Sequence, residues 1–325
     1  MLMKRMLWPA AVLFAIGLLL ALGGCGGSGR KEPAPAVPAG EKIKVYTSIY
    51  PLFDFAKNIG GDRVEVINLL PPGADPHHWE PTPGDLIKIS QCDVFVYCGA
   101  GLESWVESVL KNTGREKMVI VDCSRGIELL AGGGEHDGEK HGGKEHDGDH
   151  GGDPHIWLDP VNAGIMVDNI LAGLAGADPA GKEYYTANAQ NYKAGLAQLD
   201  GQYREALAGA RVRQFVVSHA AFGYLARRYG LEQVPIRGLT AESEPGPARM
   251  AEIVDLVRKN GIKYIFFEPL ASPRVSETIA RETGAKTLIL NPIAALTEKD
   301  INAGKNYLVL MRENLENLKT ACEAR

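Results

Sequence analysis

Two histidines of this chain stand in the same short phrase. Asp-Pro-His-x-Trp occurs at 75–79 and again at 153–157, so that His77 and His155 have matching neighbours. Proline fixes its own φ and disfavours helical backbone in the residue before it, so each phrase presents its histidine from a loop. Neutral imidazole is a common ligand of transition-metal ions. The repeat therefore indicates metal binding.

A third histidine stands between an apolar run and the start of a predicted helix. His219 follows Phe215-Val216-Val217-Ser218 and precedes Ala220-Ala221-Phe222. Ligands of open α/β sheets bind outside the carboxyl ends of the strands, and the positive end of a helix favours the neutral ring that a metal requires. Each histidine alone could be a loop or capping residue. As a set, we expect His77, His155 and His219 to bind zinc, leaving a fourth position for another group.

Three neutral imidazoles would leave the double charge of the ion uncompensated. Glu268 and Asn291 each end an apolar run, and we consider both as a fourth ligand or as a neighbour of the ligands. Either residue could instead simply form a turn at a strand end. His78 should diverge from His77 in an extended loop, so we expect it to be exposed or to support a ligand. Protonation of the ligands should weaken binding below about pH 6 to 6.5.

The two phrases are separated by a stretch rich in glycine, acidic residues and histidine. Residues 132–152 have almost no apolar side chains, so they cannot offset the entropy of ordering and are predicted to be a disordered loop. Imidazole and carboxylate donors on such a loop would collect metal with low specificity. A solvated low-complexity insertion is the alternative. The histidines concerned are His136, His141, His146 and His150.

The first residues resemble a secretory signal. Two cations precede an apolar run over 7–22. The last residue of the run, Leu22, is followed by two glycines and then Cys25. The run is shorter than the roughly 20 residues that span a bilayer, so a transmembrane anchor is the less favoured alternative. We expect residues 1–24 to be a lipoprotein signal peptide, Cys25 to be the lipidated residue and 25–41 to be a flexible tether. The formal net charge of −5 argues against a nucleic-acid partner.

The remaining chain alternates strand-like and helix-like segments, which predicts parallel sheets flanked by helices. We expect an N-terminal α/β lobe over 42–165, a linker region over 166–210 and a C-terminal α/β lobe over 211–325. One helix over 180–209 would measure about 45 Å and connect the lobes, although Gly195 and Gly201 weaken it by roughly 1 kcal/mol each. The expected strands are 43–48, 64–69, 94–98, 118–121, 214–218, 233–236, 263–267 and 286–290, and the other helices 52–59, 102–111, 220–229, 248–260, 274–283 and one from about 305. Cys98 and Cys123 close two of these strands and could form a disulfide or remain buried thiols.

These motifs resemble one known family, the solute-binding lipoproteins of bacterial ABC transporters for zinc and manganese, of the ZnuA/TroA type. The resemblance runs over nearly all of the chain that follows the expected signal peptide. The resemblance is carried by 73–77, the histidine-rich stretch, 153–160, 218–222 and 267–269. It implies two lobes joined by a rigid helix, with metal held between them by His77, His155 and His219. Histidine rather than glutamate at 219 implies zinc rather than manganese. The family's frequent fourth ligand, an aspartate, would fall near Asn291, where this chain differs.

The resemblance implies a function as the zinc-capture component of an importer. The partners would be a membrane permease and its ATPase, and the protein would be a monomer that is lipid-anchored outside the cytoplasmic membrane, on the periplasmic side or the outer cell surface. An importer component is not an enzyme. A secreted zinc hydrolase is a rival from another class, because three histidines and a water also form catalytic sites. The chain lacks the H-E-x-x-H motif, which disfavours that rival. A surface zinc chaperone or adhesin without a transporter is a third possibility.

Overall fold

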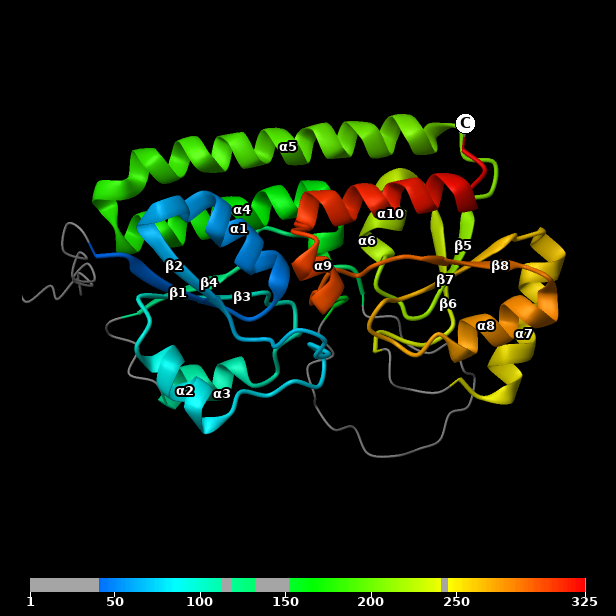
Figure 1. The fold of residues 1–325 in the computed structure, drawn as a ribbon, viewed down its shortest axis with the longest axis horizontal. Coiled ribbons are helices and arrows are strands. Elements are labelled where there is room, and N and C mark those ends of the chain that lie inside the picture. Colours follow the sequence, from blue (N-terminus) through cyan, green and yellow to red (C-terminus); the bar gives the residue numbers. More distant parts are fainter. Residues whose placement is uncertain (1–40, 113–117, 132–151, 241–244, 325) are drawn as a thin grey trace, which may run out of the picture. The chain divides into compact units, whose positions relative to one another are not determined.

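The computed structural model describes residues 41–112, 118–131, 152–240 and 245–324. Within them, two parallel four-stranded sheets are flanked by helices (Figure 1). The first half contains β1 Ile43–Thr47, α1 Tyr50–Gly60, β2 Val64–Asn68, α2 Pro83–Ser90, β3 Val94–Tyr97, α3 Val106–Asn112, β4 Val119–Asp122 and α4 Pro160–Ala177. The second half contains α5 Lys182–Ala208, β5 Gln214–Val217, α6 Gly223–Tyr229, β6 Glu232–Pro235, α7 Pro247–Asn260, β7 Tyr264–Phe267, α8 Arg274–Thr283, β8 Lys286–Ile289, α9 Glu298–Asn302 and α10 Tyr307–Ala321.

The first sheet has the strand order β2-β1-β3-β4. Its side chains alternate between two apolar layers, because successive residues of a strand point to opposite faces. Tyr46 and Phe95 are register partners on the face that is packed against α2 and α3. Val45 and Val94 are partners on the other face, which belongs to the largest core of the protein.

The second sheet repeats this plan with the order β6-β5-β7-β8. Val216 pairs with Ile265, and both belong to a core that also holds Ile253 of α7 and Ile279 of α8. The opposite face presents Phe266 to the largest core. Both lobes are therefore sheets with an apolar layer on each side, as their alternating sequence predicted.

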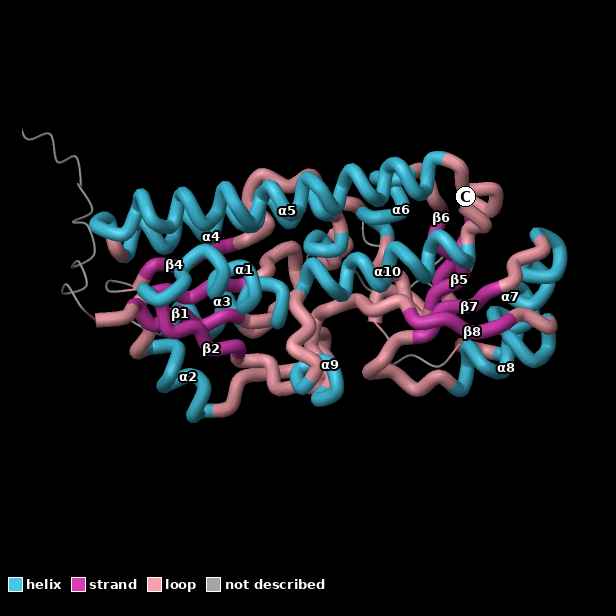
Figure 2. The backbone as a smooth tube through the Cα atoms, turned by 45° about the horizontal axis from the view of Figure 1, so that its top comes forward, coloured by secondary structure: helices cyan, strands magenta, loops and turns pink. Residues whose placement is uncertain are grey.

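The largest core is shared by the two lobes through α5 and α10. The α5 helix is 27 residues long, which corresponds to about 40 Å, and α10 lies beside it (Figures 1 and 2). Tyr203 of α5 donates a hydrogen bond to the carbonyl oxygen of Met311 of α10 at 2.6 Å. A Cβ on Gly195 would lie 3.2 Å from Leu308, so this glycine lies at the close approach of the two helices.

The expectation of two parallel α/β lobes and one long helix is confirmed. Two details were wrong or missed. The sequence reading did not identify α2, α4 or α9 as helices. The α6 helix begins at Gly223 rather than at residue 220, so His219 does not stand directly at a helix start. Cys98 and Cys123, which directly follow β3 and β4, are free, buried thiols, which is one of the two alternatives expected for them, and burial raises the pKa of each.

The segment with the predicted signal peptide and Cys25 lies outside the described residues, as does most of the histidine-rich stretch. No helix in the described part of the chain combines the length and apolar character needed to cross a membrane.

Candidate metal centre

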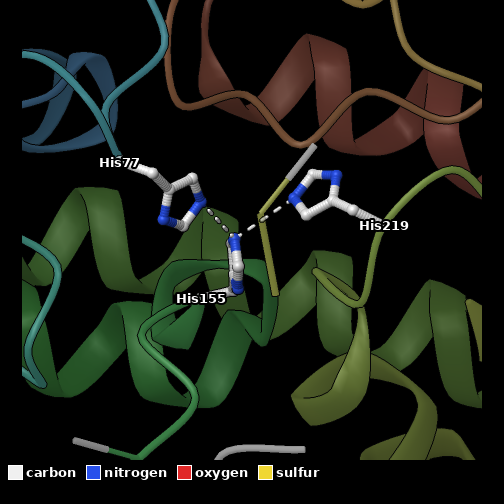
Figure 3. A group of neighbouring side chains, drawn as sticks. All are labelled: His77, His155 and His219. Carbon is white, nitrogen blue, oxygen red and sulfur yellow. Dashed lines mark hydrogen bonds between the residues drawn. The ribbon is translucent and has the colours of Figure 1, made fainter. Parts of the chain in front are cut away.

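Three loops bring the predicted histidines together (Figure 3). His77 lies between β2 and α2, His155 precedes a 3-10 turn over Ile156–Leu158, and His219 follows β5. The Nε2 atom of His155 lies 3.2 Å from Nε2 of His77 and 3.3 Å from Nε2 of His219. One ligand atom from each of the three residues lies within 4.8 Å of the others.

The repeated phrase folds into the same turn at both places. Asp75 Oδ1 accepts a hydrogen bond from the backbone N–H of His77 at 2.8 Å, and Asp153 Oδ1 accepts one from the N–H of His155 at 3.0 Å. This bond between an aspartate and the backbone two residues later is a local turn that Asp favours. The aspartate of the phrase therefore fixes the backbone from which each histidine projects.

Carboxylates determine which nitrogens of two rings carry the proton. His155 Nδ1 lies 2.8 Å from Asp153 Oδ1, and His219 Nδ1 lies 2.6 Å from Glu268 Oε1. Because an ionised carboxylate only accepts, each neutral ring is assigned the tautomer with its proton on Nδ1. Both Nε2 atoms then present lone pairs to each other at 3.3 Å. Two converging lone pairs are the arrangement that a cation requires.

Two of the three nitrogen separations match those around a tetrahedral zinc ion. Zinc binds imidazole at about 2.0–2.1 Å, so two nitrogens on a zinc tetrahedron lie about 3.3–3.4 Å apart. The observed separations of 3.2 and 3.3 Å are close to this value. Asp153 and Glu268 are both buried, and together they would balance the double charge of a divalent cation.

Burial disfavours protonation of two of the three clustered histidines. It lowers the pKa of His77 to about 2, with further lowering by the neighbouring imidazoles of His155 and His219. Burial also lowers the pKa of His155, against the opposing effect of its hydrogen bond to Asp153. A buried imidazole resists protonation because its charged form is poorly solvated. The expected loss of binding below pH 6 to 6.5 should thus move to lower pH.

The candidates for the fourth ligand lie close by but are engaged elsewhere. The cavity in front of the histidines has a volume of about 70 Å³ and is lined by both Glu268 and Asn291. Glu268 holds the far nitrogen of His219. Asn291 accepts the backbone N–H of Ile293 on its side-chain oxygen at 2.8 Å. The side chain of His78 is 47% exposed, with Nδ1 3.8 Å from Asp75, and is not among the clustered histidines.

Asp153 is the residue of the site that the sequence reading missed. A signal for it was present, because an aspartate stands two residues before the histidine in both copies of the phrase. The helix start that was expected beside His219 lies four residues later, at Gly223. A Cβ on Gly223 would lie 2.8 Å from Asp153 Oδ2, so the start of α6 packs against Asp153.

The residues that flank the histidine-rich stretch meet beside the site. The backbone N–H of Asp153 donates to the carbonyl oxygen of Leu130 at 2.9 Å. His136, His141, His146 and His150 themselves lie outside the described residues, so their role as a metal collector stays a prediction.

Comparison with known proteins gives consistent matches. A family model described as "Zinc-uptake complex component A periplasmic" (ZnuA) matches residues 45–321. The high-affinity zinc uptake system protein ZnuA of Bacillus subtilis (strain 168) is 41% identical over 312 residues, which cover 96% of this chain and 97% of that protein. The zinc-binding lipoprotein AdcA of Streptococcus pneumoniae (strain R6) is 41% identical over 278 residues, which cover 86% of this chain but only 55% of AdcA.

Solved structures agree with the sequence comparisons. The Zn(II)-bound ZnuA-like domain of S. pneumoniae AdcA superposes with a TM-score of 0.74 at 38% identity, covering 87% of this chain and 99% of that domain. The laminin-binding protein Lmb of Streptococcus agalactiae, described as having adhesin and metal-transporting activity, gives a TM-score of 0.76 at 33% identity, covering 87% of this chain and all of that one.

Two parallel α/β lobes, a long helix and these structural neighbours define the class of the protein, which is a solute-binding protein. Solute-binding proteins of the matched family act outside the cytoplasm. Within the class, the chain belongs to the ZnuA family of zinc-uptake components.

Proposed function

We propose that this protein captures Zn²⁺ outside the cytoplasmic membrane and delivers it to the permease of an ABC importer, with His77, His155 and His219 as the ligands. The observation that carries the proposal is the convergence of the Nε2 atoms of His155 and His219, whose Nδ1 protons are held by Asp153 and Glu268. The zinc-uptake and zinc-binding names of the relatives support the choice of cargo.

The fourth position is proposed to be filled by water. Glu268 is hydrogen-bonded to Nδ1 of His219, the ring nitrogen that does not face the other histidines. The side-chain oxygen of Asn291 accepts the backbone N–H of Ile293. A cavity of about 70 Å³ has room for an ion and one or two waters. Zinc bound by three histidines and a water is a common arrangement.

The anchoring and collecting functions complete the proposal. Lipidation of Cys25 would hold the protein at the membrane, and the relative AdcA is named a lipoprotein. The histidines of the histidine-rich stretch would raise the local concentration of zinc; they are His136, His141, His146 and His150. The permease and its ATPase are the proposed partners, and zinc import by them requires no covalent chemistry from this chain.

Metal analysis and competition test the proposal. Purified protein should carry or bind one zinc tightly, and zinc should displace manganese, because imidazole ligands favour zinc. His155→Ala should abolish the tight site. Tight manganese binding that zinc does not displace would refute zinc as cargo.

The rival hydrolase is tested with the same protein. Incubation with ester, phosphate and peptide substrates should give no turnover above that of His155→Ala, since Asp153 and Glu268 are bonded to ring nitrogens rather than placed as a general base. Turnover that a chelator abolishes would refute the importer function.

A further inference from the structure

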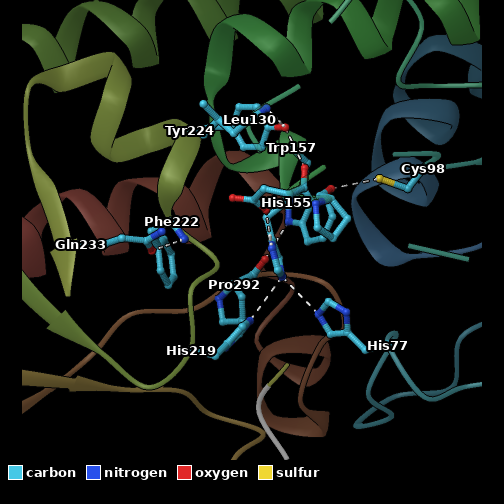
Figure 4. A network of polar contacts seen from close by, with 12 residues as sticks. His77, Cys98, Leu130, His155, Trp157, His219, Phe222, Tyr224, Gln233 and Pro292 are labelled. Carbon is cyan, nitrogen blue, oxygen red and sulfur yellow. Dashed lines mark hydrogen bonds and ion pairs between the residues drawn. The ribbon is translucent and has the colours of Figure 1, made fainter. Parts of the chain in front are cut away.

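The segment that carries His155 is held by side chains from far along the chain. Tyr224, in the first turn of α6, donates its hydroxyl proton to the carbonyl oxygen of Asp153 at 2.7 Å and accepts the backbone N–H of Leu130 at 3.0 Å (Figure 4). The hydroxyl is thus satisfied on both sides, and it fixes the residue that orients the ring of His155.

A second side chain of α6 holds the other end of this segment. Arg228 stands four residues after Tyr224, which places both on one face of the helix. Its guanidinium donates to both carboxylate oxygens of Asp159, with Nε 3.0 Å from Oδ1 and Nη2 2.5 Å from Oδ2. Asp159 is buried and also caps α4 by accepting the N–H of Val161. A forked, charge-assisted pair of this kind is strong and directional.

The middle of the segment is tied to the same half of the chain. Trp157 Nε1 donates to the carbonyl oxygen of Pro292 at 2.7 Å, and the carbonyl oxygen of Trp157 accepts the hydroxyl of Tyr307 at 2.5 Å. Four of the polar ties of residues 153–159 therefore lead to residues beyond 210, in the half that also carries His219.

The start of α6 packs directly on the carboxylate that orients His155. A Cβ added to Gly223 would lie 2.8 Å from Asp153 Oδ2, which is closer than real Cβ contacts. Only glycine permits this approach, and a larger residue would displace Asp153 or the helix.

We infer that Tyr224 and Arg228 are positioning residues, which clamp residues 153–159 from α6 so that His155 and His219 form one preorganised pair of ligands. The inference rests on the proposed function, zinc binding by the three histidines. Its physical basis is that a ligand binds tightly when its rotamer is locked before the metal arrives. The second half of the chain would then fix the positions of both His155 and His219, and the first half would contribute His77 as the remaining ligand.

The test compares each variant with a matched control. Tyr224→Phe and Arg228→Gln should each lower zinc affinity about tenfold, the lower end of the range for partners that orient ligands. Tyr203→Phe removes a similar buried hydroxyl bond, to the carbonyl of Met311, and should leave affinity unchanged. Arg63→Gln removes a similar guanidinium pair with buried Asp178 and should also leave it unchanged. Arg228→Lys, which keeps the charge but not the fork, should lie between wild type and Arg228→Gln.

A readout on the zinc-free protein separates positioning from general stability. In ¹⁵N-histidine NMR, the Nδ1–H proton of His155 that Asp153 accepts should be sharp in wild type and in the controls, and broadened or lost in Tyr224→Phe and Gly223→Ala. Wild-type affinity in both α6 variants, equal losses in the controls, or an unchanged His155 signal beside reduced affinity would overturn the inference. Tight zinc binding by His155→Ala would instead refute the proposed function.

Discussion

Lowering the pH should cost this protein much less zinc affinity than three ordinary histidines would lose. A histidine with a pKa of about 6.5 is roughly 90% protonated at pH 5.5, which reduces affinity about 11-fold per ligand and about 120-fold for two. Burial lowers the pKa of His77 to about 2 and also lowers that of His155. His77 should therefore contribute almost nothing to the loss between pH 7.5 and 5.5, and His155 should contribute less than an ordinary histidine.

Proton release on binding measures this directly. Calorimetric titration with zinc at pH 6.0, in two buffers that differ in ionisation enthalpy, gives the number of protons released per ion. Three ordinary histidines would release about 2.3 protons, or roughly 0.8 each. Because His77 is already neutral at this pH and the pKa of His155 is lowered, we expect fewer than two protons. Release of two or more protons would show that the cluster is protonated before zinc arrives and would refute the reasoning.

The stability of the zinc-free protein should show the matching sign. The folded-state pKa of His77 and of His155 lies below the unfolded value of about 6.5, so the unfolded chain binds more protons as the pH falls. The free energy of unfolding should therefore be independent of these two histidines above about pH 6.5. Below that pH it should fall by up to about 1.4 kcal/mol per pH unit for each histidine. Thermal unfolding between pH 7.5 and 5 should show this decline, and His77→Ala should reduce its slope. A melting temperature independent of pH over this range would contradict the lowered pKa values.

Three further predictions concern individual residues and the histidine-rich stretch. Glu268→Gln keeps an acceptor for His219 but removes the charge, so it should weaken zinc binding 10- to 100-fold in a chelator competition. The control Glu313→Gln, which changes an exposed ion pair with Lys305, should leave zinc binding unchanged. A loss as large as that of His77→Ala would show that Glu268 is itself a ligand. His77→Ala should abolish tight binding in the same assay and the exposed His78→Ala should leave it unchanged, while equal losses would mean that the wrong neighbour was chosen. Replacing 132–151 by a short glycine linker should remove weak zinc sites only, because Leu130 and Asp153 already meet; loss of the tight site in calorimetry would contradict the three-histidine assignment.

Most of the fold followed from local pattern, and the exceptions have physical causes. Short runs of β-branched residues between turn residues identified the strands to within one or two residues. The α4 helix was missed because it is apolar on most of its surface and contains Gly164 and Gly173, so it shows no polar face. The start of α6 was misplaced because Ala220 is a good helix former, yet its N–H bonds to the carbonyl oxygen of Gly238.

The candidate ligands could be identified from the sequence, but the side chains that support them could not. The doubled phrase identified His77 and His155 because the signal lies within five residues of sequence. The bond between His219 and Glu268 joins residues 49 apart, and the one between Tyr224 and Asp153 joins residues 71 apart. Such pairings depend on how the strands and α6 pack, which no local pattern determines.

The closed junction between Leu130 and Asp153 makes this protein a candidate scaffold for a zinc sensor. Their backbone bond brings the chain ends at 130 and 153 together beside His155, so a foreign domain with adjacent termini could replace the residues between them. Doubling the length of such a connection costs only about 0.6 kcal/mol of loop entropy. A fluorescent domain inserted there would sit two residues from a ligand, where zinc occupancy could be converted into an optical signal.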